Sequence, residues 1–392
     1  MSASLTDLGT DLGTVRRPIE TAHGLPNAHY TDTTVHLEEN QALLMDQWAG
    51  LAVTADVPEP GDAVPVTFLG NPLLLIRDRG GVVRVFQNTC RHRGMILVET
   101  PRNIQGAIRC PYHSWCYSTD GKLVSTPHVG GPGHNTHDGI DRALLGLVEI
   151  RSHVWRDVVW VNISGDAPAF EDAMADVIAR WAMFDQPLFH GGPDSRFSLE
   201  LNCNWKLAVE NYCESYHLPW VHPGLNVYSR LEDHYHIEQP GQFSGQGTVV
   251  YRQLRGDNGA VFADFQGLDS KWDTGAEYIA VYPNVLMGVH RDHAFVILLL
   301  PDGPDKTREE VHIYYATQNT NPDPALRARN AEQWRDVFVE DVFVVEGMQR
   351  GRHAPGFDGG RFSPVMDGPT HLFHTWVAEQ IEARRAMSQA AE

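Results

Sequence analysis

The sequence has few cysteines and no long apolar segment. Five cysteines in 392 residues are too few, and too odd in number, for a disulfide framework. The longest apolar runs, such as 294–301, have the length of a strand and fall short of the roughly 18 residues that cross a bilayer. The N-terminal MSASLTDLGTDLGT lacks the basic start and apolar core of a signal peptide. We therefore expect a cytoplasmic protein with no membrane partner.

Basic residues are also scarce, and histidines are abundant. Lys and Arg total 31 against 50 Asp and Glu, so the formal charge is −19 with histidine neutral. A field of this sign repels phosphate backbones, which argues against nucleic-acid binding. The 20 histidines direct attention to metal sites, because histidine is the commonest metal ligand.

The chain reads as an N-terminal segment followed by two domains. Residues 1–44 are expected to pack on the C-terminal domain, and short β-type runs over 45–165 predict a small antiparallel β domain. Residues 166–392 predict an α+β domain. Its expected helices are 170–184, 204–218 and 324–349, and its expected strands are 246–254, 277–290, 294–301 and 310–318.

The β domain carries two pairs of metal-binding side chains, Cys90-x-His92 and Cys110-x-x-His113, with seventeen residues between the pairs. A Cys2His2 zinc site is one interpretation, since zinc accepts these ligands. Each pair mixes one thiolate with one imidazole, however, which instead favours a [2Fe–2S] cluster. In such a cluster Cys90 and Cys110 hold one iron, and His92 and His113 hold the other.

The residues around these pairs suit a cluster-binding loop. Gly94 and Pro111 provide the turns that expose backbone N–H groups toward sulfur atoms. Cys116 is expected to be a small buried residue and not a ligand.

A second constellation follows in NWKLAVENYCESYHLPWVHPG. On a continuous helix, Glu210, Asn211, Glu214 and His217 form one polar stripe. Pro219 is expected to end this helix near residue 218 and to let the next turn bring His222 round to His217. A solvated surface helix is the alternative interpretation.

Two histidines need a carboxylate to form the facial triad that binds non-haem Fe(II). Asp341 is the predicted third ligand, because it shares a helix face with apolar residues such as Val337, Phe338 and Val345. A carboxylate in such surroundings is costly unless it is paired or bound to metal. Glu340 and Glu346, on other faces of the helix, are the alternatives.

Together these motifs resemble the α subunits of Rieske non-haem iron oxygenases over nearly the whole chain. The resemblance implies a Rieske domain, a helix-grip catalytic domain, and a mononuclear iron held by His217, His222 and Asp341. It also implies a head-to-tail homotrimer, in which Glu214 bridges His217 to a cluster histidine such as His113 of the neighbouring subunit. Since the chain lacks a GxGxxG nucleotide fingerprint, a separate flavin- or ferredoxin-type reductase must supply electrons from NAD(P)H.

This sequence has a glutamate at the bridge position, where ring-hydroxylating dioxygenases usually have aspartate. In this feature it resembles the branch of the family that acts on glycine betaine, carnitine and stachydrine. This likeness implies a monooxygenase that hydroxylates a C–H next to nitrogen and releases a demethylated amine and formaldehyde. Aromatic side chains that could hold a cation are Tyr212, Tyr216, Trp220, Tyr228, Tyr278 and Tyr282.

Three alternatives stay open at this stage. Ring hydroxylation or O-demethylation of a small aromatic acid would use Arg230, Arg252 or His290 to anchor a carboxylate. A simple electron carrier would leave the second metal site without a role. A zinc-stabilised binding protein would be colourless and would need no reductase.

Overall fold

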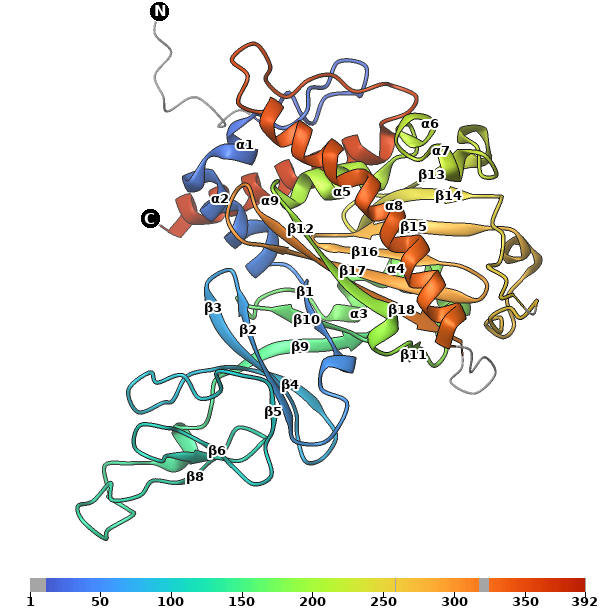
Figure 1. The fold of residues 1–392 in the computed structure, drawn as a ribbon. Coiled ribbons are helices and arrows are strands. Elements are labelled where there is room, and N and C mark those ends of the chain that lie inside the picture. Colours follow the sequence, from blue (N-terminus) through green and yellow to red (C-terminus); the bar gives the residue numbers. More distant parts are fainter. Residues whose placement is uncertain (1–11, 258, 317–323, 392) are drawn as a thin grey trace, which may run out of the picture. The chain divides into compact units, whose positions relative to one another are not determined.

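The computed structural model describes residues 12–257, 259–316 and 324–391. The chain divides into two compact units, one made of Leu51–Asp166 and the other of Met1–Gly50 together with Ala167–Glu392. Antiparallel sheets and long helices are both present (Figure 1), so the predicted α+β class is confirmed. Within the described ranges, no helix has the length and apolar character that a membrane crossing needs.

The unit 51–166 is built on a seven-stranded sheet with the order β1-β10-β9-β4-β3-β2-β5 and a three-stranded sheet β6-β7-β8. Neighbouring strands pair antiparallel along β10-β9-β4-β3-β2. The strands are β1 (Ala49–Val53), β2 (Asp62–Phe68), β3 (Asn71–Arg77), β4 (Val83–Gln87), β5 (Arg102–Asn103), β6 (Ile108–Arg109), β7 (Cys116–Tyr117), β8 (Leu123–Ser125), β9 (Glu149–Trp155) and β10 (Val158–Asn162).

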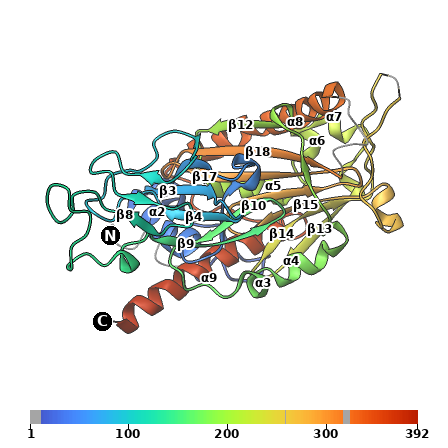
Figure 2. The same cartoon turned by 90° about the horizontal axis from the view of Figure 1, so that it is seen from below.

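The second unit, made of Met1–Gly50 and Ala167–Glu392 and called the C-terminal unit below, contains an eight-stranded antiparallel sheet. Its order is β11-β18-β17-β16-β15-β14-β13, and β12 also pairs with β18; Figure 2 shows this succession from β12 at one edge to β13 at the other. The strands are β11 (Phe189–His190), β12 (Arg196–Leu201), β13 (His234–Gln239), β14 (Phe243–Thr248), β15 (Ala276–Val281), β16 (Val285–Val289), β17 (His293–Pro301) and β18 (Thr307–Tyr315). Strand β17, with the sequence HAFVILLLP, is buried over its first seven residues, as its apolar composition requires.

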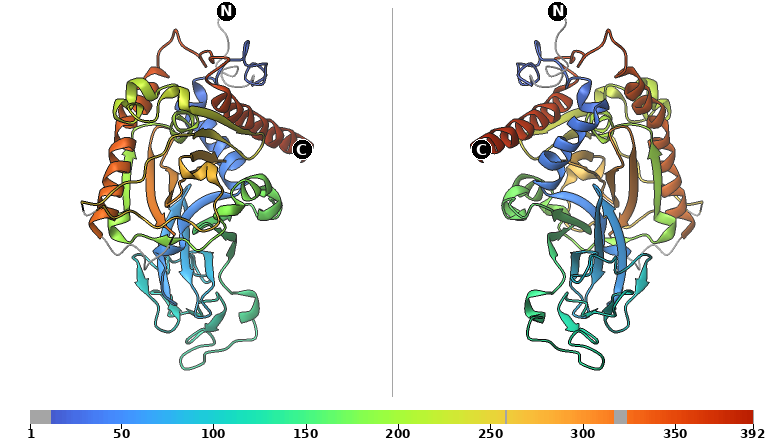
Figure 3. Two further views of the ribbon diagram at one scale, coloured as in Figure 1. Left: turned by 90° about the vertical axis from the view of Figure 1, so that its right-hand side faces the viewer. Right: turned by 90° about the vertical axis from the view of Figure 1, so that its left-hand side faces the viewer.

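Three helices pack together with this sheet. Helix α5 (Trp205–Cys213) contacts α8 (Pro324–Gly351), α9 (Gly368–Ala391) and the central strands. Figure 1 shows α8 lying across the strands, and Figure 3 shows α8 and α9 well apart from each other. Asn204 directly precedes helix α5, and its side chain accepts a hydrogen bond from the backbone N–H of Lys206, as is typical of an N-cap.

The N-terminal segment belongs to the same unit as the eight-stranded sheet. It forms α1 (Ala28–Thr31), α2 (Thr33–Glu39) and a π-helical turn (Asn40–Met45). Lys206 on α5 reaches Glu39 with an Nζ–Oε2 distance of 2.6 Å, and both side chains are buried. The Glu39 carboxylate also contacts His29 Nδ1 at 2.9 Å.

Removing one member of this ion pair should destabilise the C-terminal unit. We expect Lys206→Ala to lower its free energy of unfolding by about 3 kcal/mol, because Glu39 is left buried without its cation. The measurement is the denaturant midpoint followed by tryptophan fluorescence. Lys271→Ala, which removes an exposed lysine, is the matched control and should change the midpoint very little. Equal midpoints for the two variants would contradict the prediction.

Two of the predicted helices are wrong in extent. The expected helix 170–184 is broken into α3 (Phe170–Ala173), α4 (Ala175–Arg180) and a 3-10 turn (Ala182–Phe184). The apolar spacing is kept, but Arg180 and the Trp181 indole both donate to Glu277, with N–O distances of 2.8–3.0 Å. These side-chain bonds hold the end of α4 against the sheet at the point where the helix stops.

The expected helix 204–218 ends at Cys213, and Glu214 is extended with φ −121° and ψ 160°. The Glu214 carboxylate accepts hydrogen bonds from the backbone N–H groups of Tyr216 and His217, so it competes with the helix for these donors. Pro219 lies in the first turn of the next helix, α6 (Leu218–Val221), where proline is well tolerated. The predicted single polar stripe is therefore wrong.

The strands also differ from the prediction. The expected strand 246–254 ends at Thr248 in β14. The expected strand 277–290 is two strands, β15 and β16, because the chain turns at residues 282–284. The end of the expected strand 310–318 lies partly outside the described residues. Strands β12 and β13 were not predicted, because the alternating sequences RFSLEL and HYHIEQ contain many polar residues.

Candidate functional site

The first candidate site lies in two loops of the unit 51–166 that have the same backbone pattern. Cys90 N donates to Met95 O at 2.8 Å, and Gly94 N donates to Cys90 O at 2.9 Å. In the second loop, Cys110 N donates to Trp115 O at 2.8 Å, and Ser114 N donates to Cys110 O at 3.0 Å.

Each loop turns through a residue in the left-handed region. Gly94 has φ +73° and Ser114 has φ +59°; glycine adopts this conformation at no steric cost. The loops therefore present their Cys and His side chains in matched positions.

The four side chains of these loops are divided between an inner and an outer pair. Cys90 and Cys110 are buried in the hydrophobic core of this unit, whereas His92 is exposed. The His92 and His113 rings lie with their centroids 4.7 Å apart and their planes at 70°. His113 Nδ1 is buried and has no hydrogen-bond partner among the described residues, which fits a nitrogen kept for a metal.

The sulfur of Cys90 has a hydrogen-bonding neighbour. Tyr117 OH lies 3.3 Å from Cys90 Sγ and accepts a hydrogen bond from the backbone N–H of Arg91 at 3.0 Å. Burial raises the pKa of Tyr117, so its hydroxyl is protonated and can donate to the sulfur. Hydrogen bonds of this kind adjust the potential of an iron–sulfur cluster. Cys116 Sγ instead donates to Ser114 O at 3.3 Å.

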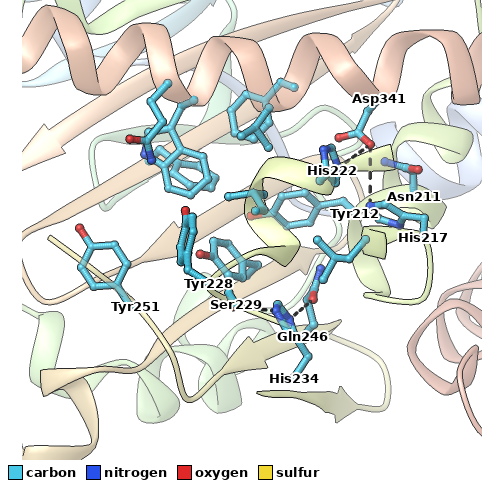
Figure 4. A pocket seen from close by; sticks show the side chains of 18 of the residues that line it. Asn211, Tyr212, His217, His222, Tyr228, Ser229, His234, Gln246, Tyr251 and Asp341 are labelled. Carbon is cyan, nitrogen blue, oxygen red and sulfur yellow. Dashed lines mark hydrogen bonds and ion pairs between the residues drawn. The ribbon is translucent and has the colours of Figure 1, made fainter. Parts of the chain in front are cut away.

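The second candidate site is formed by three side chains of the C-terminal unit. His217 directly precedes α6, His222 directly follows it, and Asp341 lies in the middle of α8. One potential ligand atom from each lies within 4.8 Å of the others, the only such group of three or more in the described part of the chain. Asp341 Oδ1 is 3.0 Å from His222 Nε2 and 3.8 Å from His217 Nε2 (Figure 4).

This group has the properties of a metal site. Asp341 Oδ1 is buried and has no hydrogen-bond partner of suitable geometry in the described residues. Two imidazoles and one carboxylate, with further positions left open, make the donor set that suits non-haem iron. The α6 turn brings the two histidines together, with ring centroids 5.1 Å apart.

Each of the two histidines also contacts a carboxylate of its own through Nδ1. His217 Nδ1 lies 2.7 Å from Glu214 Oε1, and His222 Nδ1 lies 2.8 Å from Glu340 Oε2. Such bonds place the proton on Nδ1 and leave Nε2 free to bind a metal. Burial lowers the pKa of His222, but its contacts with Asp341 and Glu340 outweigh this effect, so the pKa is raised overall.

Glu340, an alternative to Asp341 as the predicted third metal ligand, has a different place in the structure. It contacts His222 through Nδ1, the ring nitrogen that faces away from Asp341, and so orients the imidazole. The other alternative, Glu346, accepts hydrogen bonds from the backbone and side-chain N–H groups of Asn202. Glu210 points away from this site and contacts Tyr30, Arg352 and His374.

The role of Glu340 can be tested directly. We expect Glu340→Gln to lower the affinity for mononuclear iron about 10- to 100-fold, because the carboxylate that orients His222 is lost. Iron retention during titration with a chelator measures the change, and the visible absorbance of the cluster should stay. Glu332→Gln, on an exposed face of the same helix, is the control. Equal iron retention by the two variants would contradict this role.

A pocket opens beside the three ligands (Figure 4). It is mainly aromatic and aliphatic, and no lysine or arginine is among the described residues that line it. Its lining includes the side chains of Asn211, Tyr212, Tyr228, Tyr251, Tyr278 and Trp334.

The aromatic residues predicted from the sequence divide into two groups. Tyr212, Tyr228 and Tyr278 line the pocket. Trp220 is 70% exposed and does not line it, and neither does Tyr216, which packs against Trp220. Tyr282 is buried elsewhere, where its hydroxyl donates to Ser244 Oγ at 2.8 Å and its ring packs on Trp376.

The proposed carboxylate anchors do not enter the pocket either. Arg230 is an exposed residue that pairs with Glu232. Arg252 is exposed and lies over the Tyr228 ring, 5.6 Å from its centroid. His290 is buried next to Tyr278, and burial lowers its pKa well below the usual value. It therefore carries no positive charge for a carboxylate.

Sequence reasoning missed the polar chain that holds Glu214. Gln246 Nε2 donates to the Glu214 carbonyl at 3.0 Å, and Gln246 Oε1 lies 2.7 Å from His234 Nδ1. His234 Nε2 in turn contacts Ser229 Oγ at 3.0 Å. These residues come from β13, β14 and the loop before them, and no local motif marks them.

Comparison with known protein families agrees with this geometry. Residues 192–383 match the model of the ring hydroxylating alpha subunit (catalytic domain), and residues 47–137 match the Rieske [2Fe-2S] domain. This chain is a Rieske non-haem iron oxygenase α subunit. It thus contains a Rieske [2Fe-2S] domain and a catalytic domain, and the catalytic domain carries a His–His–Asp candidate iron site.

Among curated proteins, this oxygenase subunit is similar to the chloroplastic choline monooxygenase of Arabidopsis thaliana. The two are 28% identical over 372 residues, which cover 91% of this chain and 82% of the plant protein. It is also 25% identical to the carnitine monooxygenase oxygenase subunit of Acinetobacter pittii, over 87% of this chain and 88% of that protein. The chain is therefore a Rieske oxygenase subunit related to quaternary ammonium monooxygenases, which implies a reductase as partner.

The fold of this oxygenase subunit is also that of a solved relative. A quaternary ammonium Rieske monooxygenase superposes with a TM-score of 0.76 at 23% identity, covering 94% of this chain and 98% of that chain. The likeness concerns the fold, and the choice of substrate must be argued from the pocket itself.

Proposed function

We propose that this chain is the terminal oxygenase of a monooxygenase that hydroxylates a C–H bond next to nitrogen in a small quaternary ammonium or N-methyl compound. One atom of O2 enters the C–H bond, and the other leaves as water with two electrons and two protons. NAD(P)H would supply the electrons through a separate reductase. Where the oxidised carbon is an N-methyl group, the carbinolamine breaks down to the demethylated amine and formaldehyde.

The observation that carries this proposal is the lining of the pocket beside the candidate iron ligands. Its aromatic rings offer faces to a cation, and no lysine or arginine among the described lining residues would repel one. The relatives named for choline and carnitine oxidation support the same class of substrate.

Each group of residues has a proposed role. Cys90, His92, Cys110 and His113 would hold the [2Fe–2S] cluster, and His217, His222 and Asp341 would hold the mononuclear iron. When bound, these groups supply electron storage and O2 activation. The chain itself fixes both iron-binding imidazoles through Glu214 and Glu340, and it encloses the substrate in an apolar pocket.

We further propose that the enzyme works as a head-to-tail homotrimer. Glu214 would contact a cluster histidine of the neighbouring subunit while it holds His217, and so would link the two metal sites. Sedimentation would detect the trimer.

A single turnover tests the proposed reaction without the reductase. The chemically reduced holoenzyme is mixed with O2 and with choline, glycine betaine, carnitine, an N-methyl amino acid or a small aromatic acid. We expect an ammonium or N-methyl compound to give hydroxylated product, or formaldehyde where an N-methyl group is attacked. Turnover of the aromatic acid alone would overturn the proposal in favour of ring hydroxylation or O-demethylation.

A further inference from the structure

The substrate pocket has a second end, away from the iron ligands. Trp334 and Asp341 both line the pocket and lie on α8. They are seven residues apart, which corresponds to about 10 Å along a helix axis. Figure 4 shows Tyr251 on the side of the pocket opposite Asp341. A substrate that extends from the iron would therefore place its far end near Tyr251 and Trp334.

A chain of hydrogen bonds behind this end connects both aromatic side chains. The Tyr251 hydroxyl donates to Asp292 Oδ1 at 2.9 Å, and His293 Nδ1 lies 2.8 Å from the same oxygen. The Trp334 indole donates from Nε1 to His293 Nε2 at 2.8 Å. Because an indole N–H can only donate, His293 Nε2 accepts and the His293 proton lies on Nδ1. His293 is therefore neutral.

Asp292 places a negative charge behind this wall. Its side chain is fully buried, and Oδ2 has no hydrogen-bond partner among the described residues. The neighbouring Arg291 forms its ion pair with Asp264 and reaches Asp292 only through the longer-range attraction of their charges; no arginine or lysine of the described residues forms an ion pair with Asp292. A buried carboxylate without a cation in direct contact is costly, and a positive charge in the adjacent pocket would offset part of that cost.

No lysine or arginine is among the described residues that line the pocket, and Arg252, which lies over the Tyr228 ring, is outside the lining. His290 is uncharged because burial lowers its pKa, and its Nε2 lies 3.1 Å from the Tyr278 hydroxyl. Its ring stacks on His293, with centroids 4.2 Å apart. The aromatic wall is therefore backed by neutral imidazoles and one carboxylate.

We propose that Tyr251 and Trp334, held by the buried Asp292–His293 pair, form a cation site at the end of the pocket away from the iron ligands. The preferred substrate then carries an amine or ammonium group at its far end and not a carboxylate. This inference rests on the proposed function and narrows it to diamine-like or ω-amino quaternary ammonium compounds. Asp292 and His293 act as positioning residues, since they reach the substrate through Tyr251 and Trp334.

Three ligands that differ only at their far end test this site. (4-Aminobutyl)trimethylammonium, butyltrimethylammonium and γ-butyrobetaine share a trimethylammonium head and a four-carbon chain that ends in a cation, a methyl group or a carboxylate. Their dissociation constants for the holoenzyme are measured by anaerobic calorimetry, and substrate-dependent O2 uptake is recorded in parallel. We expect the cationic end to bind at least about tenfold more tightly than the carboxylate end.

Variants assign this preference to the buried network. Asp292→Asn keeps the shape and removes the charge, so the ratio of the two dissociation constants should fall toward one. Tyr251→Phe, a milder change that removes only one hydroxyl, should reduce the same ratio and covers the case in which Asp292→Asn does not fold. Asp273→Asn, which removes an exposed carboxylate near Arg291, and Arg252→Gln should leave the ratio unchanged.

The outcomes separate this inference from the proposed function. Equal binding of the three ligands, or an unchanged ratio in Asp292→Asn and Tyr251→Phe, overturns the cation site alone. Tighter binding of γ-butyrobetaine that is lost in Arg252→Gln also overturns it, since Arg252 would then anchor a carboxylate. If none of the three ligands binds and an aromatic acid is oxidised, both the cation site and the proposed function fail.

Discussion

Replacing Asp341 with alanine should abolish substrate oxidation while the protein keeps the colour of its cluster. The candidate iron site has three protein ligands among the described residues, so the loss of the carboxylate leaves two neutral imidazoles and removes the charge that balances the metal. We expect turnover to fall by more than about 100-fold, beyond the effect of losing a residue that only orients a ligand. One iron atom per chain should be lost, and the two cluster irons should stay.

The measurements are iron content, visible absorbance and O2 uptake on the same preparation. Asp336→Ala removes an exposed carboxylate from the same helix and should retain full activity. His217→Ala should behave like Asp341→Ala, since it removes another ligand of the same metal. An Asp341→Ala protein that keeps its mononuclear iron and its turnover would show that the iron is bound elsewhere. A colourless wild-type protein that contains only zinc would exclude the oxygenase altogether.

Replacing Glu214 with glutamine should separate metal binding from electron delivery. Glutamine keeps the length of the side chain and can still contact His217, so we expect both metals to be retained when ferrous iron is in excess. Reductase-driven turnover should fall by more than about 100-fold, because the charged link between His217 and the neighbouring cluster is lost.

Two rates test this role: turnover with electrons supplied by the reductase, and reoxidation of a cluster that was reduced beforehand. The rate at which the reduced cluster is reoxidised after substrate and O2 are added should fall in step with reductase-driven turnover. Glu232→Gln, an exposed residue of the same region, should behave as wild type. Near-normal turnover of Glu214→Gln would show that electrons reach the iron by another route. Loss of iron from this variant would assign Glu214 to metal binding instead.

The predicted fold class was correct because it depends on patterns within single segments. Strand β17 and helix α8 were recognisable from a continuous apolar run and from a long helical period. The helices predicted at 170–184 and 204–218 were too long, because their ends are set by side-chain bonds. In the first, Arg180 and Trp181 donate to Glu277, which is 96 residues or more away in the sequence. In the second, Glu214 captures the backbone donors that would continue the helix.

The sequence by itself was enough to predict which residues form the two metal sites. The spacing of Cys90, His92, Cys110 and His113 is local, and so is that of His217 and His222, because short loops fix the separation of their side chains. Asp341 is far from the two histidines in the sequence. It could be proposed as their partner only because an acidic residue among apolar neighbours on a helix is costly without a partner.

Only the tertiary structure decided what surrounds these ligands. Glu340 changed from an alternative ligand to the residue that orients His222, because α8 places it behind the ring. Trp220 and Tyr282 lie outside the pocket, although their residue type suited it. The Asp292–His293 pair joins Tyr251 to Trp334 across segments more than 80 residues apart. Such contacts depend on which faces of distant elements meet, and no local spacing in the sequence records that.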